Sequence, residues 1–431
     1  MKTEIAGHPR GLAALFLTEM WERFSYYGMR AMLVLYLVQG LAWTPSRASV
    51  LYGFYTGLVW LTPIFGGYIA DRFWGAQKSL LVGGLVIASG HFVLAIEAMP
   101  AFYIGLLLVA LGTGLFKPNV SACVGELYAE GDPRRDSGFT IFYMGINLGA
   151  FIGPIVTGWL RVRYGWPYGF AAAGVGMLLA VLTLMATRKK FLGTAGLLPS
   201  AKRRAAEGAP PSGPLTKDEW ERVTALFVIS FFVIFFWAAY EQAGNSMNVF
   251  AAQSTRLSLG SWTLIPEWFQ SIDAVFVLAS APLLALLWPW LSRRNLEPST
   301  TRKMAIGLVV MGLGFIFMIA AAQDVKAGHL ASPWYLVLAY AFHTWGELCL
   351  SPIGLSLVTK VAPVKIVSLM MGVWFLSNFA GNVVGGFLGA LTGTIRDPVT
   401  FWAIFLAFPV VAGVVLFMLA PKLQRLMHGR G

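Results

Sequence analysis

Long apolar runs recur along almost the whole chain, and they restrict the possible folds more than any other feature. A helix needs about 20 apolar residues to cross a bilayer. Twelve runs of about that length occur, near residues 13–39, 48–70, 79–97, 101–125, 137–160, 167–187, 223–250, 268–291, 303–322, 333–358, 366–391 and 398–420. Only 12% of the residues are charged, whereas soluble domains carry about 25%. We therefore predict an all-α integral membrane protein with 12 transmembrane helices.

The placement of the basic residues indicates the topology of these helices. The formal net charge is +12, and most Lys and Arg residues fall at the termini and in alternate connections between the runs. Cationic loops stay in the cytoplasm during insertion, so we expect both termini there and no nucleic-acid partner. Residues 1–12 are too short and polar for a cleavable signal peptide. Cys123 and Cys349 lie in apolar runs and are interpreted as buried thiols rather than a disulfide.

One long polar segment divides the chain. Residues 188–222 are rich in Lys, Arg, Pro, Gly and Ala, and contain no stretch that could span a membrane. They separate a predicted six-helix bundle, 1–187, from a second, 223–431. The segment is either a solvated tether or a surface that lies on anionic lipid. Two six-helix halves are the layout of the major facilitator transporters. The loop "GGYIADRFWGAQKS" at 66–79 favours that reading over an ordinary cytoplasmic loop.

Charged residues lie inside the first apolar run, where each costs about 2.5–3.5 kcal/mol at the centre of a membrane helix. On a helix Glu19, Arg23, Tyr26 and Arg30 share a narrow sector, and it is flanked by Glu22 and Tyr27. This face must be turned toward protein or water rather than lipid.

Further charges occur in four other runs, namely Lys117, Glu241, Asp273 and Glu347. Together with the four charged residues of the first run, these residues comprise three cations and five carboxylates. Because an excess of buried carboxylates is costly, some of these acids are expected to bind protons. The cations suit a substrate that carries a carboxylate. The alternative is a static set of structural ion pairs, which seldom draws on five helices.

The sequence resembles the proton-dependent oligopeptide transporter family of the major facilitator superfamily. The resemblance is carried by "EMWERFSYYG" at 19–28, "GGYIADRFWG" at 66–75 and "FYMGINLGA" at 142–150. It extends to "GLFKPNVS", "FFWAAYEQ", "GELCLSPIGLSLV" and "MMGVWFLSNFAGN" further along the chain. The resemblance implies proton-coupled uptake of di- and tripeptides by alternating access, with a central charged cavity and no cofactor.

The resemblance also implies roles for individual residues. Proton coupling would involve Glu19, Glu22, Arg23, Lys117 and Glu241. The peptide carboxylate would meet Arg30 and Lys117, and Arg30 would exchange a salt bridge with Glu241. The amino end would be held by Asn147 and Glu347, and the remaining pocket residues would be Tyr26, Tyr27, Trp60, Asp273 and Trp374.

The chain departs from the family pattern in three places. Residues 188–222 cannot supply the two extra helices that bacterial members usually carry between the halves. Asp273-Ala274 stands where Asn-Pro is typical, and Trp60 stands where a Tyr is common. Asp273 could strengthen amine binding, add a proton site or pair with Arg30 or Lys117. A weakly active or self-blocked transporter is therefore an alternative.

Other functions fit these residues less well than peptide symport. Transport of nitrate or another small anion keeps the fold, but the acids Glu347 and Asp273 argue against it. An intramembrane enzyme would need a nucleophile with a base, or a metal cluster. His343 and Glu347 come nearest to a metal pair and have no third ligand at suitable spacing. We expect no metal, no ATP site, and a monomer in the bacterial inner membrane with lipid around it. His343 could tune Glu347, although a packing role is favoured, as it is for His91.

Overall fold

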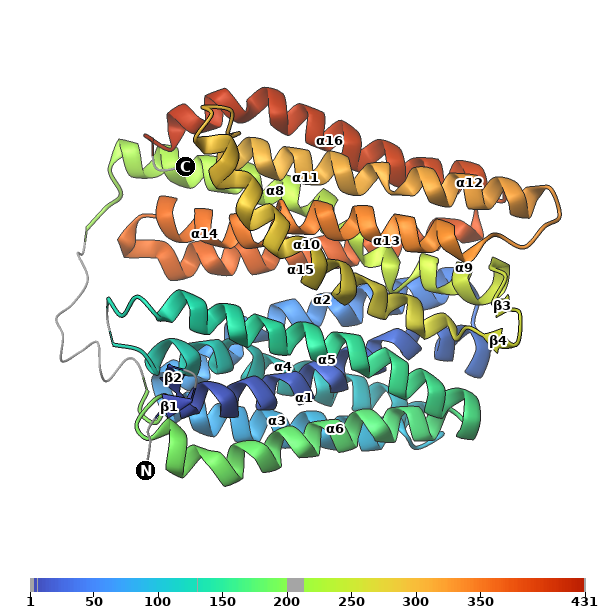
Figure 1. Ribbon diagram of the computed structural model, residues 1–431, viewed down its shortest axis with the longest axis horizontal. Coiled ribbons are helices and arrows are strands. Elements are labelled where there is room, and N and C mark those ends of the chain that lie inside the picture. The colour runs from blue at the N-terminus through green and yellow to red at the C-terminus, as the bar shows by residue number, and fades with distance from the viewer. Residues whose placement is uncertain (1–3, 6, 130, 200–212, 430–431) are drawn as a thin grey trace. The chain divides into compact units, whose positions relative to one another are not determined.

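The computed structural model describes residues 4–5, 7–129, 131–199 and 213–429, so 200–212 of the predicted linker lie outside the described residues. The described chain is almost entirely helical, as predicted (Figure 1). Its strands form two short antiparallel hairpins, β1 (Glu4–Ile5) with β2 (His8–Pro9) and β3 (Ser258–Leu259) with β4 (Trp262–Thr263).

Contacts group the residues into two units. The first comprises Met1–Tyr36 and Leu58–Ala209, and the second comprises Leu37–Gly57 and Pro210–Gly431. Helix α2 (Pro45–Ile69) therefore contributes its start to the second unit and its end to the first. The division into 1–187, 188–222 and 223–431 stays a prediction.

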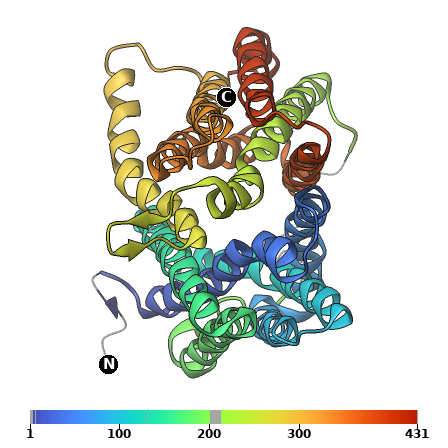
Figure 2. The same cartoon turned by 90° about the vertical axis from the view of Figure 1, so that its right-hand side faces the viewer.

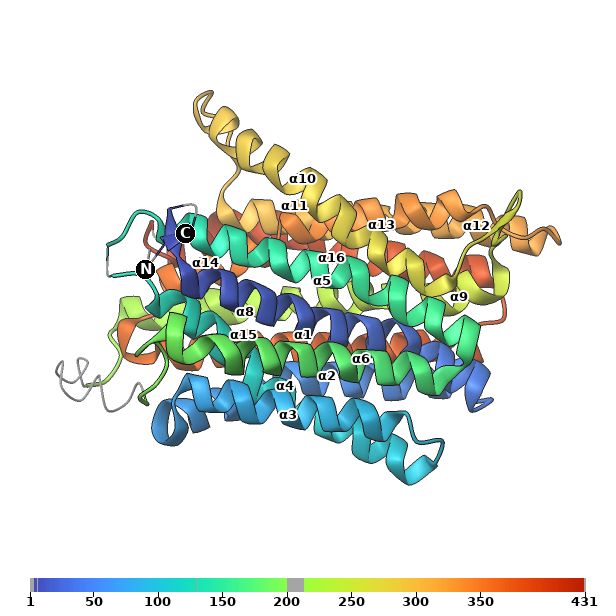
Figure 3. The same ribbon diagram turned by 60° about the horizontal axis from the view of Figure 1, so that its bottom comes forward.

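The first unit holds five further long helices. They are α1 (Arg10–Leu35), α3 (Ala76–Leu94), α4 (Met99–Glu126), α5 (Arg135–Tyr164) and α6 (Trp166–Thr187), with π-helical turns η2 (Ala70–Trp74) and η3 (Arg188–Leu192). Helix α1 packs against α5 and α6, and α3 packs against α4 (Figure 3). Glu19, Glu22, Arg23 and Arg30 on α1 are at most 8% exposed, so these charges avoid the hydrocarbon.

The second unit is built from helices that are broken more often. They are α8 (Lys217–Tyr240), α9 (Ser246–Ser254), α10 (Phe269–Ser292), α11 (Thr300–Leu313), α12 (Phe315–Lys326), α13 (Pro333–Leu348), α14 (Ser351–Val361), α15 (Val367–Ala390) and α16 (Pro398–Leu426). Short turns η4 (Glu241–Ala243), η5 (Pro266–Trp268), η6 (Val364–Ile366) and η7 (Leu391–Gly393) connect or extend them, whereas η1 (Tyr36–Gly40) follows α1 and precedes α2. Figure 2 views these helices nearly end-on, with α10 in yellow at the margin of its unit.

Ten helices among the described residues are long and apolar enough to cross a membrane. The predicted run at 13–39 is not one of them, because α1 carries Glu19, Glu22, Arg23 and Arg30. The run at 333–358 is not counted because α13 ends at Leu348 and α14 starts afresh at Ser351. The count of 12 spans therefore stays a prediction.

The apolar run at 223–250 differs from the helix that it predicts. The run at 223–250 is interrupted by η4, and its helix α8 begins six residues early, at Lys217. The early start follows from a capping box, in which Thr216 and Glu219 each bond the other's backbone N–H. Such a cap requires only polar residues, so hydropathy does not reveal it.

Glycines allow α1 and α5 to approach closely. A Cβ atom at Gly149 would lie 2.2 Å from the backbone oxygen of Met20, and one at Gly153 would lie 2.6 Å from that of Phe24. Small residues at such positions bring the backbones of membrane helices into contact. Thr157 then donates a hydrogen bond of 3.0 Å to the backbone oxygen of Gly28. This contact holds the face of α1 that carries Met20, Phe24 and Gly28 against α5.

Candidate functional site

The charged residues of α1 form a buried ion-pair cluster in the first unit. Arg23 Nε lies 2.9 Å from Glu19 Oε1 and 2.5 Å from Glu22 Oε2. All three side chains are at most 6% exposed. Lys117 on α4 adds a favourable Coulomb interaction with both carboxylates. The structure thus brings together four of the residues that we assigned to proton coupling.

Aromatic rings lie close to the cations of this cluster and to Arg30. The Lys117 ammonium lies 3.3 Å from the centroid of the Trp60 ring. The guanidinium groups of Arg23 and Arg30 lie 5.7 and 5.8 Å from the rings of Tyr26 and Tyr27 respectively. A cation over an aromatic face is stabilised electrostatically, most strongly by Trp and where water is excluded. The indole of Trp60 therefore supports the Lys117 charge in this chain.

Asn147 also belongs to the first unit and is 5% exposed. It lies on α5, the helix that packs on α1. Its amide donates a hydrogen bond of 2.9 Å to the backbone oxygen of Tyr143, one turn earlier. The amide is thus held along its own helix, and its binding of a substrate amine remains a prediction.

A second polar cluster lies in the second unit, around the hydroxyl group of Tyr240. This oxygen lies 3.0 Å from Asp273 Oδ2 and 3.0 Å from Glu347 Oε2. Three helices supply these groups: α8, α10 and α13. Thr344, one turn before Glu347, places its hydroxyl 2.5 Å from Asp273 Oδ1. We call Tyr240, Asp273, Thr344 and Glu347 the acid–hydroxyl cluster.

The acid–hydroxyl cluster contains two residues that sequence reasoning missed, Tyr240 and Thr344. Tyr240 directly precedes Glu241, and Thr344 lies two residues before the quoted segment "GELCLSPIGLSLV" that contains Glu347. A polar residue three positions before an intramembrane acid is on the same side of a helix, and that spacing could have drawn attention to Thr344. Nothing comparable singles out Tyr240, because its partners lie on other helices.

Glu241 takes a different position from the other acids. It opens the short turn η4 and is 5% exposed. The Tyr52 hydroxyl donates to its Oε2 over 3.4 Å, and neighbouring Asn245 accepts a hydrogen bond of 2.8 Å from Ser49. Glu241 and these partners belong to the second unit, whereas Arg30 belongs to the first. The exchange between Arg30 and Glu241 stays a prediction.

Trp374 and the two buried histidines are held by packing contacts. Trp374 is 3% exposed, and a Cβ atom at Gly354 of α14 would lie 2.1 Å from its ring. The His343 ring lies 4.7 Å from that of Phe315. Within the described residues neither nitrogen of His343 or His91 has a hydrogen-bond partner. Both histidines therefore fit the packing role that we favoured.

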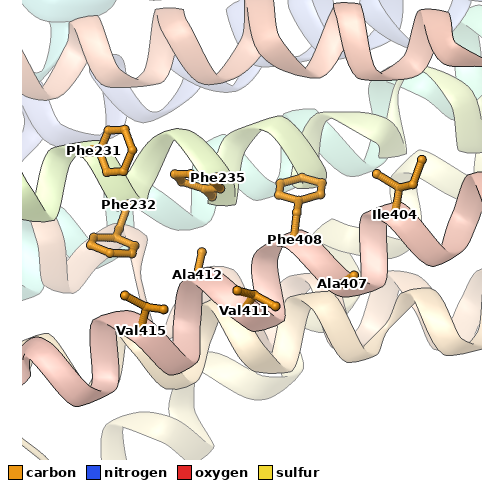
Figure 4. Close-up of a pocket in the computed structure, with 9 residues that line it drawn as sticks. All are labelled: Phe231, Phe232, Phe235, Ile404, Ala407, Phe408, Val411, Ala412 and Val415. Carbon is orange, nitrogen blue, oxygen red and sulfur yellow. The ribbon is translucent and has the colours of Figure 1, made fainter.

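A further hollow lies between α8 and α16, outside both clusters (Figure 4). It measures about 530 Å³ and is lined by Phe231, Phe232, Phe235, Ile404, Ala407, Phe408, Val411, Ala412 and Val415. Every lining residue is apolar, so this hollow offers no group that could hold a charged substrate. Its apolar walls are suited to contact with hydrocarbon groups.

A family model described as the POT family matches residues 77–196 and 213–402 of this chain. Similar curated proteins include an uncharacterized transporter, YclF, of Bacillus subtilis, which is 40% identical over 98% of this chain and 96% of its own length. The peptide transporter YePEPT of Yersinia enterocolitica is 34% identical over the same shares. A di-/tripeptide transporter of Lactococcus lactis subsp. cremoris is 31% identical over 98% and 97%.

Solved structures of POT transporters also match this chain. A crystal structure of peptide transporter POT in complex with sulfate superposes with a TM-score of 0.91 at 36% identity, covering 99% of this chain and 97% of that one. A POT family transporter in complex with 5-aminolevulinic acid gives 0.88 at 29% identity, covering 98% of each. The predicted resemblance, the major facilitator fold and a multi-pass membrane protein are thereby confirmed.

Proposed function

The chain belongs to the POT family, and we propose that it carries di- and tripeptides into the cell together with protons, by alternating access. The observation that carries the proposal is a pair of ionisable clusters: one contains Arg23 and, beside Trp60, Lys117, and the other contains two acids beside Tyr240. A peptide is a zwitterion with a variable middle. Groups that bind mainly its two ends leave the side chains loosely selected.

We assign the cations to the carboxylate of the peptide. Arg30 and Lys117 would bind it, because charge-assisted hydrogen bonds to a carboxylate are the strong ones. Glu19, Glu22 and Arg23 are already in contact. A change in the charge of Lys117 or of either acid therefore alters the electrostatic interactions of the whole cluster. That coupling, together with Glu241, is the proposed route by which protons and peptide act on each other. Tyr26, Tyr27 and Trp60 would complete this wall.

We assign the acids to the amino end of the peptide. Glu347 and Asp273 each present a carboxyl oxygen to the Tyr240 hydroxyl, and Asn147 would add an amide oxygen. Trp374 would limit the pocket near α14. Asp273 supplies a negative charge that an Asn would not, so it favours an ammonium group.

The chain is proposed to act without a metal or other cofactor, as a monomer in lipid, and not as an enzyme. Among the described residues, three possible metal ligands group at Asp218, Glu221 and His428. His428 Nε2 lies 2.8 Å from Glu221 Oε2 at an exposed position. These groups belong to the ends of α8 and α16 rather than to either buried cluster, and they do not support intramembrane catalysis.

Uptake by proteoliposomes tests the proposal. With an acidic exterior and a negative interior, labelled dialanine should accumulate, and other di- and tripeptides should compete with it. Nitrate should not compete. Absence of uptake for every peptide, in a preparation where YePEPT is active, would contradict symport and would support the self-blocked alternative.

A further inference from the structure

The connection between α10 and α11 carries an excess of positive charge within the second unit. Residues 293–303 contain four cations and one carboxylate. That carboxylate, Glu297, forms an ion pair with Lys303, and hydrogen bonds from Lys303 and Ser292 lower the pKa of Glu297. The other three cations are all exposed and are Arg293, Arg294 and Arg302. The connection therefore attracts anions.

Aromatic rings hold two of these cations in place. The Lys303 ammonium lies 4.6 Å from the centroid of the Trp288 ring, so Lys303 keeps the end of α10 beside the start of α11. The Arg302 guanidinium lies 5.2 Å from the centroid of the Phe417 ring on α16. A guanidinium stacked on a ring keeps the N–H groups at its edge available to a phosphate or carboxylate.

Helix α11 begins with two hydroxyl groups that lack a partner. Ser299 occupies the N-cap position, but its side chain does not cap the helix. Thr301 lies in the first turn and is completely buried. Within the described part of the chain, neither hydroxyl has a hydrogen-bond partner. Because a buried hydroxyl without a partner is costly, both indicate that an acceptor is missing here.

The first turn of α11 adds backbone donors at the same place. The helix has 14 residues, and the N–H groups at the start of a helix favour an anion, as does the helix dipole. Helical side chains lean toward the N-terminus, and threonine uses two rotamers in helices. The Thr301 hydroxyl can therefore turn toward an anion that is bound at the first turn.

The connection lies at the edge of the membrane. The apolar spans on either side of it end at Ser292 and start at Thr300. Figure 1 shows it at the same end of the second unit as the C-terminus, which we expect in the cytoplasm. Exposed apolar side chains border the cations: Trp290 is 45%, Leu296 64% and Phe417 44% exposed. Cations beside exposed apolar groups at this level suit a lipid better than a soluble anion.

From these observations we propose that the start of α11 binds the phosphodiester group of an anionic phospholipid, such as phosphatidylglycerol. The phosphate accepts hydrogen bonds from the first-turn N–H groups, Ser299 and Thr301. Arg302 neutralises its charge, and the acyl chains contact Leu296 and Phe417. The site lies outside both ionisable clusters and does not depend on the proposed transport activity.

Native mass spectrometry of the delipidated protein tests the site without a transport substrate. Phosphatidylglycerol should bind several-fold more tightly than phosphatidylcholine, whose choline group cancels the charge of the phosphate. Equal affinities would overturn the proposal. Excess inorganic phosphate should not displace phosphatidylglycerol, because it has no acyl chains. Displacement by inorganic phosphate would assign the site to a soluble anion and contradict the lipid.

A charge variant and its control separate the site from general attraction to a basic surface. Arg302→Gln should weaken phosphatidylglycerol binding several-fold, since charge-assisted hydrogen bonds to phosphate are the strong ones. Arg425→Gln is the matched control, because Arg425 is an exposed cation in the last turn of α16, and the affinity should stay as in the wild type. Equal weakening by both variants would show that only the overall charge matters.

Thr301→Val tests the hydroxyl group at similar side-chain shape. It should weaken phosphatidylglycerol binding and leave the thermal unfolding temperature of the lipid-free protein unchanged, because the hydroxyl has no partner to lose. Thr400→Val is the opposite case: its hydroxyl donates to Asp397 over 2.7 Å, so it should lower that temperature and leave lipid affinity unchanged. Unchanged lipid affinity in Thr301→Val would remove Thr301 from the site and contradict the proposal.

Discussion

At the scale of single residues, Lys117 is the side chain on which transport should depend most. It interacts with Glu19 and Glu22 and lies on the face of Trp60. Lys117→Ala removes the only charge that α4 brings to the cluster within its described residues, and proton-driven uptake of dialanine should be lost. Lys78→Ala is the control, since Lys78 is exposed beside Trp74, and uptake should stay normal. Near-normal uptake in Lys117→Ala would contradict its role.

The ring of Trp60 should set the strength of the Lys117 site. A cation–π contact is worth about 0.5–1 kcal/mol where it is exposed and about 2 kcal/mol or more where water is excluded. Trp60→Leu should therefore weaken dialanine binding by several-fold, and Trp60→Phe should weaken it less. Trp74→Leu removes the comparable indole beside exposed Lys78, 5.3 Å from its ammonium, and should leave affinity unchanged. Calorimetry of dialanine binding measures all three variants, and equal affinities would show that Trp60 has no such role.

The intramembrane charges and their contacts within one helix could be predicted from the sequence. Their contacts with residues on other helices could not. The helical period places Glu19 and Arg23 on one face, and the structure confirms their contact at 2.9 Å. The acid–hydroxyl cluster draws Tyr240, Asp273 and Glu347 from three helices. Periodicity gives the direction of a side chain within one helix. It does not give the pairing of that helix with others, which depends on packing.

At the scale of whole helices, the contact between α1 and α5 should limit stability. A Cβ atom at Gly149 would lie 2.2 Å from the Met20 backbone oxygen, and added atoms in a packed interior typically cost about 1–3 kcal/mol. Gly149→Ala should lower the thermal unfolding temperature in detergent. Gly372→Ala on α15 is the matched control, since nothing lies within 4 Å of its added Cβ. Unfolding temperatures that change equally in both variants would refute the close-packing account.

The start of α16 should give a pH-dependent contribution to stability. Hydrogen bonds from Thr400 and then Lys326 lower the pKa of Asp397 to about 2. Because the folded pKa lies below the ordinary value of 3.8, this stabilisation is present above that value and is lost as the pH falls toward 2. Asp397→Asn keeps a capping residue and removes the charge.

Thermal unfolding across that acidic range should distinguish the two proteins. The unfolding temperature of the wild type should fall more steeply than that of Asp397→Asn. Parallel curves would show that the carboxylate of Asp397 does not contribute.

Helix positions could be predicted from hydropathy better than helix ends and breaks. The apolar runs locate the helices, but α8 begins at Lys217 because Thr216 caps it, and the run at 333–358 breaks after Leu348. Caps and breaks depend on local hydrogen bonds and packing. Average hydropathy over about 20 residues does not contain that information.

At the scale of the whole molecule, alignments with the relatives are longer than this chain. The alignment with YclF covers 475 positions, more than the 431 residues present, and the family match is interrupted between 196 and 213. The short connection in place of two extra helices stays a prediction. The family could be recognised from motifs alone, because those motifs combine rare intramembrane charges with fixed spacing.

The central claim is that peptide and proton move together, and the pH inside proteoliposomes tests it most directly. An inward gradient of dialanine is imposed with no initial pH difference, and a trapped pH-sensitive dye reports the lumen. The account predicts that the lumen acidifies when dialanine enters and that Lys117→Ala abolishes this response. Entry of labelled dialanine by the wild type with no change in luminal pH would contradict it.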